Sequence, residues 1–187
     1  MQKSATGALL GLSLLFSLSA FAQDRPTAAT DVTKADLDAV FATLGNSIDK
    51  QVKIVDIGSD TNVAVGILHR GEMRSESNVS GIVHHQVTEV YYILEGSGTL
   101  LTGGPIAGVR EFPADSSAVT ELIGPSAMGT FTSGTRRPVS AGDVVVIPAG
   151  VPHGFSHIET GGVSYLSIRV DPEQVLPAGW VNPVLSR

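Results

Sequence analysis

Apolar residues recur in this chain with two different periods, which predict two kinds of element. The first is the i, i+3, i+4, i+7 spacing of one helix face, at Leu37, Val40, Phe41 and Leu44. Thr33 to Asp36 can form a capping box at the start of this helix, and Gly45 is placed to end it. We therefore expect one short helix that packs on the outside of a larger structure.

The rest of the chain changes to a period of two, which is typical of strands. Short β-branched runs are separated by Gly, Pro, Ser and Asn, the residues of tight turns. The predicted strands cover residues 51–57, 62–69, 89–94, 99–102, 144–147 and 163–170, with a further one near 128–131. Because no repeat of two equal halves is present, these strands predict one all-β sandwich or barrel. The long stretch 103–140 is expected to contain strands of its own or to cover a site.

The first residues have the pattern of a secretory signal peptide. Lys3 precedes a short apolar run, residues 8–16, and small residues then fit a cleavage site between Ala22 and Gln23. The run is short for a membrane span, and no stop-transfer charges follow it. We expect a signal peptide (1–22), a disordered linker (23–31), one domain with its helix (32–170) and an extended tail (171–187). The mature protein is then expected to be secreted to the periplasm, without a membrane anchor.

Composition narrows the chemistry further. The chain has no cysteine, which excludes disulfides, thiolate metal sites and cysteine nucleophiles. Any metal would sit on imidazole and carboxylate, ligands that suit Fe, Mn, Ni, Cu or Zn. The formal net charge is −6 and the Lys and Arg residues form no cluster, so nucleic acid is not an expected partner. A small molecule is the expected ligand.

Four of the five histidines fall in two windows. The first window, residues 81–98, contains His84, His85 and Glu89, and the second, residues 142–157, contains His153 and His157. Each window is a predicted strand between turn glycines. Two distant strands with these side chains predict a divalent metal site where they meet inside the β-structure.

The period of two also indicates which side chains share a face. His153 and His157 would lie on one face of their strand, and Glu89 and Tyr91 on one face of theirs. We take Glu89, His157 and Tyr91 as candidate catalytic residues: Glu89 as a metal ligand and base, His157 as an acid or base, and Tyr91 as a group that orients a substrate. Arg169 could bind a substrate carboxylate, but we expect it to be exposed.

The two windows resemble the two conserved motifs of the cupin superfamily, a small antiparallel β-barrel related to jelly rolls. Gly142 to His153 follow the motif G-x5-P-x-G-x2-H, with His157 where the family usually has Asn. In the first window Glu89 and Gly96 have the family spacing. The family also expects two histidines two residues apart, whereas this chain has adjacent histidines at 84 and 85.

This departure leaves the ligand set open. Side chains that are neighbours on a straight strand face opposite ways, so only one of the two histidines would reach a metal, whereas a bulge could turn both inward. The site is then either two His and one Glu or three His and one Glu. We favour the fuller set of His84, His85, Glu89 and His153.

The resemblance implies an all-β fold, a cupin or jelly-roll-type antiparallel β-barrel with one short N-terminal helix, and a homodimer. Cupins include dioxygenases, decarboxylases, lyases and sugar isomerases. We expect a metal-dependent enzyme of dioxygenase type that acts on an oxygenated small molecule. A non-oxidative lyase or isomerase and a non-catalytic barrel that binds a metal or small ligand are the alternatives.

Overall fold

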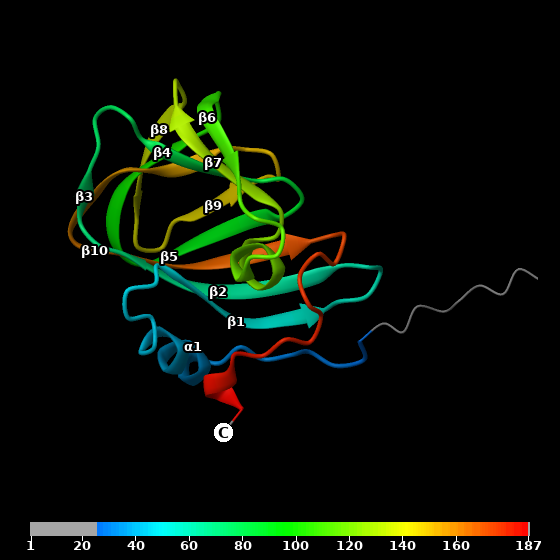
Figure 1. Cartoon of the computed structure of the whole chain (residues 1–187). Coiled ribbons are helices and arrows are strands. Elements are labelled where there is room, and N and C mark those ends of the chain that lie inside the picture. The colour runs from blue at the N-terminus through cyan, green and yellow to red at the C-terminus, as the bar shows by residue number, and fades with distance from the viewer. Residues whose placement is uncertain (1–25, 187) are drawn as a thin grey trace, which may run out of the picture.

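Two long strands organise the fold, and each belongs to two sheets (Figure 1). In this computed structural model, which describes residues 26–186, they are β5 (Thr88–Thr102) and β10 (His153–Asp171). The two strands pair antiparallel, but residues 159–162 are left out of the register between the two halves of β10. Each half therefore joins different neighbours. The predicted signal peptide and the first residues of the predicted linker lie outside the described residues.

Glycine makes this close crossing of β5 and β10 feasible. Gly96 has a φ of +78°, and a Cβ there would overlap the carbonyl oxygen of Gly162 on the opposite strand. Residues with a side chain rarely adopt that backbone conformation. The glycines that resemble turn signals in the sequence are thus points of close approach between two strands.

The first sheet has the strand order β1-β2-β10-β5-β9 and is antiparallel throughout. It combines the second half of β10 with the first half of β5. The other members are β1 (Asp49–Asp56), β2 (Asn62–Arg70) and β9 (Val144–Ile147).

The second sheet combines the other halves of β10 and β5 in the order β6-β7-β4-β10-β5-β8. Its members are β4 (Ser80–His84), β6 (Ile106–Glu111), β7 (Ser126–Phe131) and β8 (Thr135–Ser140), and the short β3 (Met73–Arg74) also pairs with β10. The stretch 103–140 thus contains three strands, with the helical turn η1 (Ala118–Ile123) between β6 and β7. The predicted all-β, jelly-roll-type architecture is confirmed, although the hydrogen-bonded ladders of the described residues do not close into a ring.

The main core lies between the two sheets. Its buried members come from both, and include Ile93, Leu100, Val145, Phe155 and Tyr165. Burial of apolar side chains on the inward faces is the chief force that holds the sheets together. The site described below borders this core, since the core residue Tyr91 contacts His153.

The helix α1 (Lys34–Phe41) packs on the outside of the first sheet, as predicted. Thr33 and Asp36 form the expected capping box, and Val40 packs against Val52 and Ile67. Within residues 26–186, no helix has the length and apolarity required to span a membrane.

The C-terminal residues run along the free side of β1. The backbone N–H of Ile54 donates to the carbonyl of Trp180, and that of Asn182 donates to Val52. The segment then ends in η2 (Pro183–Leu185) beside α1. This pairing covers an edge strand that would otherwise expose unpaired backbone groups.

Candidate metal centre

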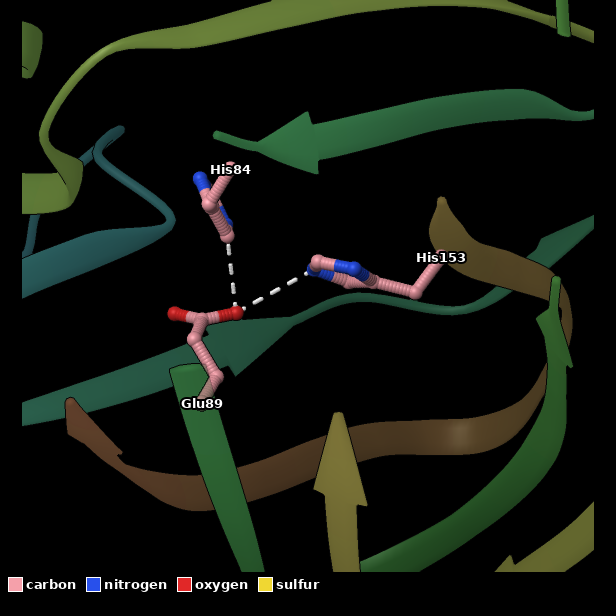
Figure 2. Close-up of side chains that lie close together, drawn as sticks. All are labelled: His84, Glu89 and His153. Carbon is pink, nitrogen blue, oxygen red and sulfur yellow. Dashed lines mark ion pairs between the residues drawn. The ribbon is translucent and has the colours of Figure 1, made fainter. Parts of the chain in front are cut away.

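Three elements bring one polar side chain each to a single point. His84 is the last residue of β4, Glu89 is near the start of β5, and His153 is the first residue of β10. Figure 2 shows both imidazole rings directed at one oxygen of Glu89. The Oε2 atom of Glu89 lies 3.2 Å from Nε2 of His84 and 3.1 Å from Nε2 of His153. Exposed fractions of 4%, 2% and 2% show that the cluster is buried.

The other ring nitrogen of each histidine is already engaged. Nδ1 of His153 lies 3.0 Å from the carbonyl oxygen of Val151. A carbonyl only accepts, so this nitrogen must carry the hydrogen. Nδ1 of His84 lies 2.7 Å from the hydroxyl of Ser126, which itself donates to the carbonyl of Gly124. The hydroxyl has one hydrogen, so it accepts from His84.

Both Nε2 atoms therefore present a lone pair to the cluster when the rings are neutral. They face a carboxylate oxygen, and Nε2 of His153 is buried without a hydrogen-bond partner. Three acceptors that face one another require a cation between them, either a proton or a metal ion. A histidine that donates through one nitrogen and offers the other is the usual arrangement of a metal ligand.

Different partners hold the two oxygens of Glu89. Oε1 accepts from the hydroxyl of Ser167 at 2.7 Å and from Nε of Arg169 at 3.0 Å, and Oε2 accepts from the hydroxyl of Tyr91 at 2.9 Å. Burial by itself would raise the pKa of Glu89, but its interactions with the facing His153 and His84, followed by the charge of Arg169, hold it well below its ordinary value. Glu89 is therefore a carboxylate, with Oε2 turned toward the histidines.

Arg169 overturns one expectation from the sequence. It is fully buried instead of exposed, because it shares the inward face of β10 with Ser167. Its guanidinium donates to Oε1 of Gln51 at 2.6 Å and also to Asp49, both on β1. Burial opposes its charge, but the pKa of Arg169 is raised because Asp49 and Glu89 outweigh that penalty.

Sequence reasoning missed Asp49, Gln51 and Ser167. A signal exists for Ser167, which is a polar residue in the largely apolar second half of β10, but not for Asp49 and Gln51, because β1 contains other polar residues. Gly66 on β2 gives a second signal. A Cβ at that position would lie 2.6 Å from Nη1 of Arg169, so the missing side chain makes room for the guanidinium.

The structure does not bring His85 to the cluster. Its Nε2 lies 2.8 Å from a carboxylate oxygen of Glu111, and both side chains are largely exposed. The pairing of β4 with β7 runs without a bulge up to His84, so the next side chain points outward. Four residues separate His84 from Glu89, and the residue two positions before His84 is the apolar Ile82.

The structure does not bring His157 to the cluster either. Its Nε2 pairs with Glu159 at 3.0 Å, near the surface. The register of β10 against β5 shifts between Phe155 and His157, so the period of two that would align His157 with His153 is broken. Tyr91, by contrast, lies at the cluster. It donates to Glu89, and burial first, with the neighbouring carboxylate, raises its pKa well above the ordinary value.

These residues fit a divalent transition metal. The three ligand atoms lie within 4.8 Å of one another, and two imidazoles with one carboxylate form a donor set that is typical of non-haem iron. Fe, Mn, Ni, Cu and Zn all accept such donors, so the ligands do not identify the ion.

Comparison with known proteins identifies the family of this chain. A family model described as Cupin matches residues 65–187. No curated protein matches the chain.

Several solved structures are similar to the chain at low identity. A protein from Bacillus halodurans is 13% identical, with 84% of this chain and 92% of that chain covered and a TM-score of 0.44. Oxalate decarboxylase from Bacillus subtilis is 17% identical, with 66% and 25% covered and a TM-score of 0.39. Vicilin from Capsicum annuum is 16% identical, with 59% and 23% covered and a TM-score of 0.34. This chain thus spans a quarter or less of the last two.

Proposed function

The chain belongs to the cupin family, and from that premise we propose that it is a metal-dependent enzyme that acts on an oxygenated small molecule. One observation carries the proposal. Two imidazole nitrogens and a carboxylate oxygen, all buried, converge with their lone pairs directed at one another.

In this proposal Nε2 of His84, Nε2 of His153 and Oε2 of Glu89 hold the ion. A bound ion of this kind supplies Lewis-acid and redox chemistry to a small molecule at its remaining positions. His85 and His157 have no part in the site, since each pairs with a surface glutamate instead.

The other residues of the site prepare it for this role. Arg169 and Ser167 occupy Oε1 of Glu89, which fixes the carboxylate and leaves Oε2 as the oxygen that faces the histidines and Tyr91. The hydroxyl of Tyr91 is a hydrogen-bond donor beside the cluster, and it donates to Oε2 of Glu89. It is placed to donate a hydrogen bond to a bound small molecule if it releases the carboxylate. Burial excludes bulk water, which strengthens each of these electrostatic interactions.

We propose an oxidative reaction of dioxygenase type on an enol, catechol or hydroxy-keto compound. The donor set supports this choice, because two histidines and one carboxylate are typical of iron oxygenases. A non-catalytic barrel is the second candidate. The burial of all three ligands favours it, since a substrate can reach them only if covering residues move.

The test is elemental analysis of the protein purified from its native compartment, with four alanine variants. His84→Ala and His153→Ala should lose a near-stoichiometric ion, whereas the matched controls His85→Ala and His157→Ala should keep it. Oxygen uptake with enol and catechol compounds then distinguishes the enzyme from the binding barrel. Wild-type protein without any transition metal, and with a melting temperature that a chelator does not change, would contradict the proposal that the protein binds a metal.

We also propose that the protein is exported and matures by removal of residues 1–22. Intact mass measured on protein from the periplasmic fraction should correspond to a chain that begins at Gln23. A full-length mass in the cytoplasmic fraction would contradict export.

A further inference from the structure

A cavity of about 380 Å³ lies between β1, the helical turn η1 and the C-terminal segment that runs beside β1 (Figure 1). Its lining includes Asp49 and Gln51 of β1, Ser117 and Glu121 at η1, and Trp180 of the C-terminal segment. Cavities of this size hold small molecules. None of the three candidate metal ligands lines it, so it is a separate place in the molecule.

Two polar atoms of the cavity lining lack a partner. Nε2 of Gln51 and Oδ1 of Asp49 are buried, and neither makes a hydrogen bond to a described residue. Gln51 is 3% exposed, and its Oε1 accepts from Arg169, so the amide cannot be reversed to give its nitrogen a partner. A buried polar group without a partner destabilises the fold, and it therefore indicates a water or a ligand.

These two atoms specify the chemistry of a ligand. Oδ1 of Asp49, in a carboxylate that is paired with Arg169, accepts hydrogen bonds, and Nε2 of Gln51 donates them. A simple anion has no hydrogen to donate to the carboxylate, and an ammonium group has no lone pair for the amide. A hydroxyl group both donates and accepts through one oxygen. A molecule with several hydroxyl groups therefore matches both atoms.

Trp180 adds an apolar surface to the cavity. It packs against the core residues Ile54 and Leu176, and it also lines the cavity. A flat aromatic ring offers the C–H groups of a sugar ring a surface to pack on. The cavity thus combines an aromatic surface with a few polar groups, which is typical of small-molecule sites.

The charges around the cavity favour a neutral ligand. Lys50 is the one cation among the described residues that line it, and its ammonium group already donates to the carbonyl and the hydroxyl of Thr43. An anion would meet the carboxylates of Asp49 and Glu121 instead. We infer that this cavity binds a neutral cyclic polyol, such as a sugar in its ring form.

This inference does not depend on the metal. Arg169 donates to Asp49 and Gln51 through its two Nη atoms and to Glu89 through Nε. The guanidinium thus connects the two places, but the polyol and the ion have different ligand atoms. Binding of the polyol should therefore persist in EDTA.

The test is a fluorescence titration, because Trp180 is the only tryptophan of the chain and a ligand in the cavity changes its surroundings. The probes are D-glucose, D-galactose and myo-inositol. At least one should give a saturable change, with a dissociation constant on the order of 1–10 mM for so small a ligand. D-Glucuronate, which adds a carboxylate to the same ring as glucose, should bind at least about 10-fold more weakly than the best probe.

Two variants locate the binding. Gln51→Glu removes the unpartnered donor and keeps an oxygen for Arg169, so the dissociation constant should rise at least about 10-fold. Ser117→Phe places a ring in the cavity and should have an effect at least as large. Ser117 is exposed and caps nothing with its side chain, so this variant should keep the metal content and melting temperature of the wild type.

Thr120→Phe is the matched control. Thr120 is exposed on the same helical turn but does not line the cavity, so this variant should bind the probe as the wild type does. A wild-type chain whose fluorescence no probe changes would assign the two unpartnered atoms to buried water and overturn the inference. Binding that survives Ser117→Phe, or that D-glucuronate equals, would also overturn it. Binding that EDTA abolishes would place the polyol at the ion and overturn the separate site.

Discussion

Glu89 receives a different kind of support at each of its carboxylate oxygens. Arg169 and Ser167 fix Oε1, while Tyr91 and the two histidines surround Oε2. Charge-assisted hydrogen bonds in a buried site are stronger than neutral ones at the surface. The ionised state and the orientation of Glu89 are therefore properties of its neighbours.

Tyr91 allows this support to be measured. Tyr91→Phe removes the donor to Oε2 of Glu89 and retains the ring, so we expect a loss of about 1.5–3 kcal/mol of unfolding free energy, the usual value for a hydrogen bond to a charged group. Tyr92→Phe is the control, because the adjacent tyrosine is on the outward face. Urea unfolding of both variants checks the prediction, and equal stabilities would show that the hydroxyl contributes nothing to the fold.

Single residues also show where a local pattern was misleading. His84 and His85 are chemically equivalent in the sequence, and the direction of one strand separates them into a buried ligand candidate and a surface residue. Arg169 would be exposed by its residue type alone. It is buried because Asp49, Gln51 and Glu89 each accept from it, and all three are distant from it in sequence.

At the level of elements, β2 and β10 approach closely where Arg169 crosses Gly66. Gly66→Ala should cost about 1–3 kcal/mol of unfolding free energy, because the guanidinium is fixed by its partners and cannot move away from the new methyl group. Gly71→Ala is the control, since a Cβ there meets nothing within 4 Å. Thermal unfolding of the two variants tests this, and two unchanged transitions would mean that Arg169 yields without penalty.

Helix α1 is tied to β1 by a pH-sensitive contact. Hydrogen bonds from Lys53 and from the backbone of Thr33 lower the pKa of Asp36 below 3.8, despite an opposing contribution of burial. A lowered pKa stabilises the fold above the unfolded value and stops doing so as the pH falls through the folded one. Asp36→Asn should therefore reduce the melting temperature at pH 7, with a gap to wild type that narrows below pH 3.8.

Asp38→Asn serves as the comparison for this helix. Asp38 pairs with Lys34 on the exposed side of α1, and exposed pairs contribute little. Its melting temperature should follow that of the wild type at every pH. A constant gap between Asp36→Asn and wild type down to pH 2 would exclude the ionised pair as the cause.

The elements also explain why the predicted strands were too short. Residues 89–94 and 99–102 belong to one strand, β5, and the predicted strand at 163–170 is the second half of β10. Glycine separated them in the sequence because it is frequent in turns. In the molecule Gly96 and Gly162 permit two continuous strands to cross instead.

At the level of the whole molecule, the candidate metal centre joins β4, β5 and β10 across both sheets. An ion that binds the folded chain only must stabilise it in proportion to the logarithm of its free concentration. Ion at 100 times its dissociation constant should add about 2.7 kcal/mol, and EDTA should remove this increment. His84→Ala should show no response to either reagent, and a response equal to that of the wild type would place the ion elsewhere.

Local sequence patterns were sufficient to predict the helix, the fold class and most of the candidate metal ligands. Periodicity and a capping box indicated α1, and β-branched runs separated by turn residues indicated the fold class. Two motifs pointed to a ligand set of His84, His85, Glu89 and His153, and the structure brings all of these together except His85. Each of these patterns consists of residues that are close together in the chain, so the sequence alone is sufficient to detect it.

Other features of the fold and the site could be seen only in the packed structure. The first sheet is apolar on both faces, so a period of two cannot tell which face turns inward. The burial of Arg169 in the first sheet, and the choice between His84 and His85 at the end of β4, depend on how the strands pair and how the sheets meet. The pairing of β10 with β5 also decides the position of His157. A shift in register between Phe155 and His157 turns this side chain away from the site, and the sequence of β10 alone does not show the shift.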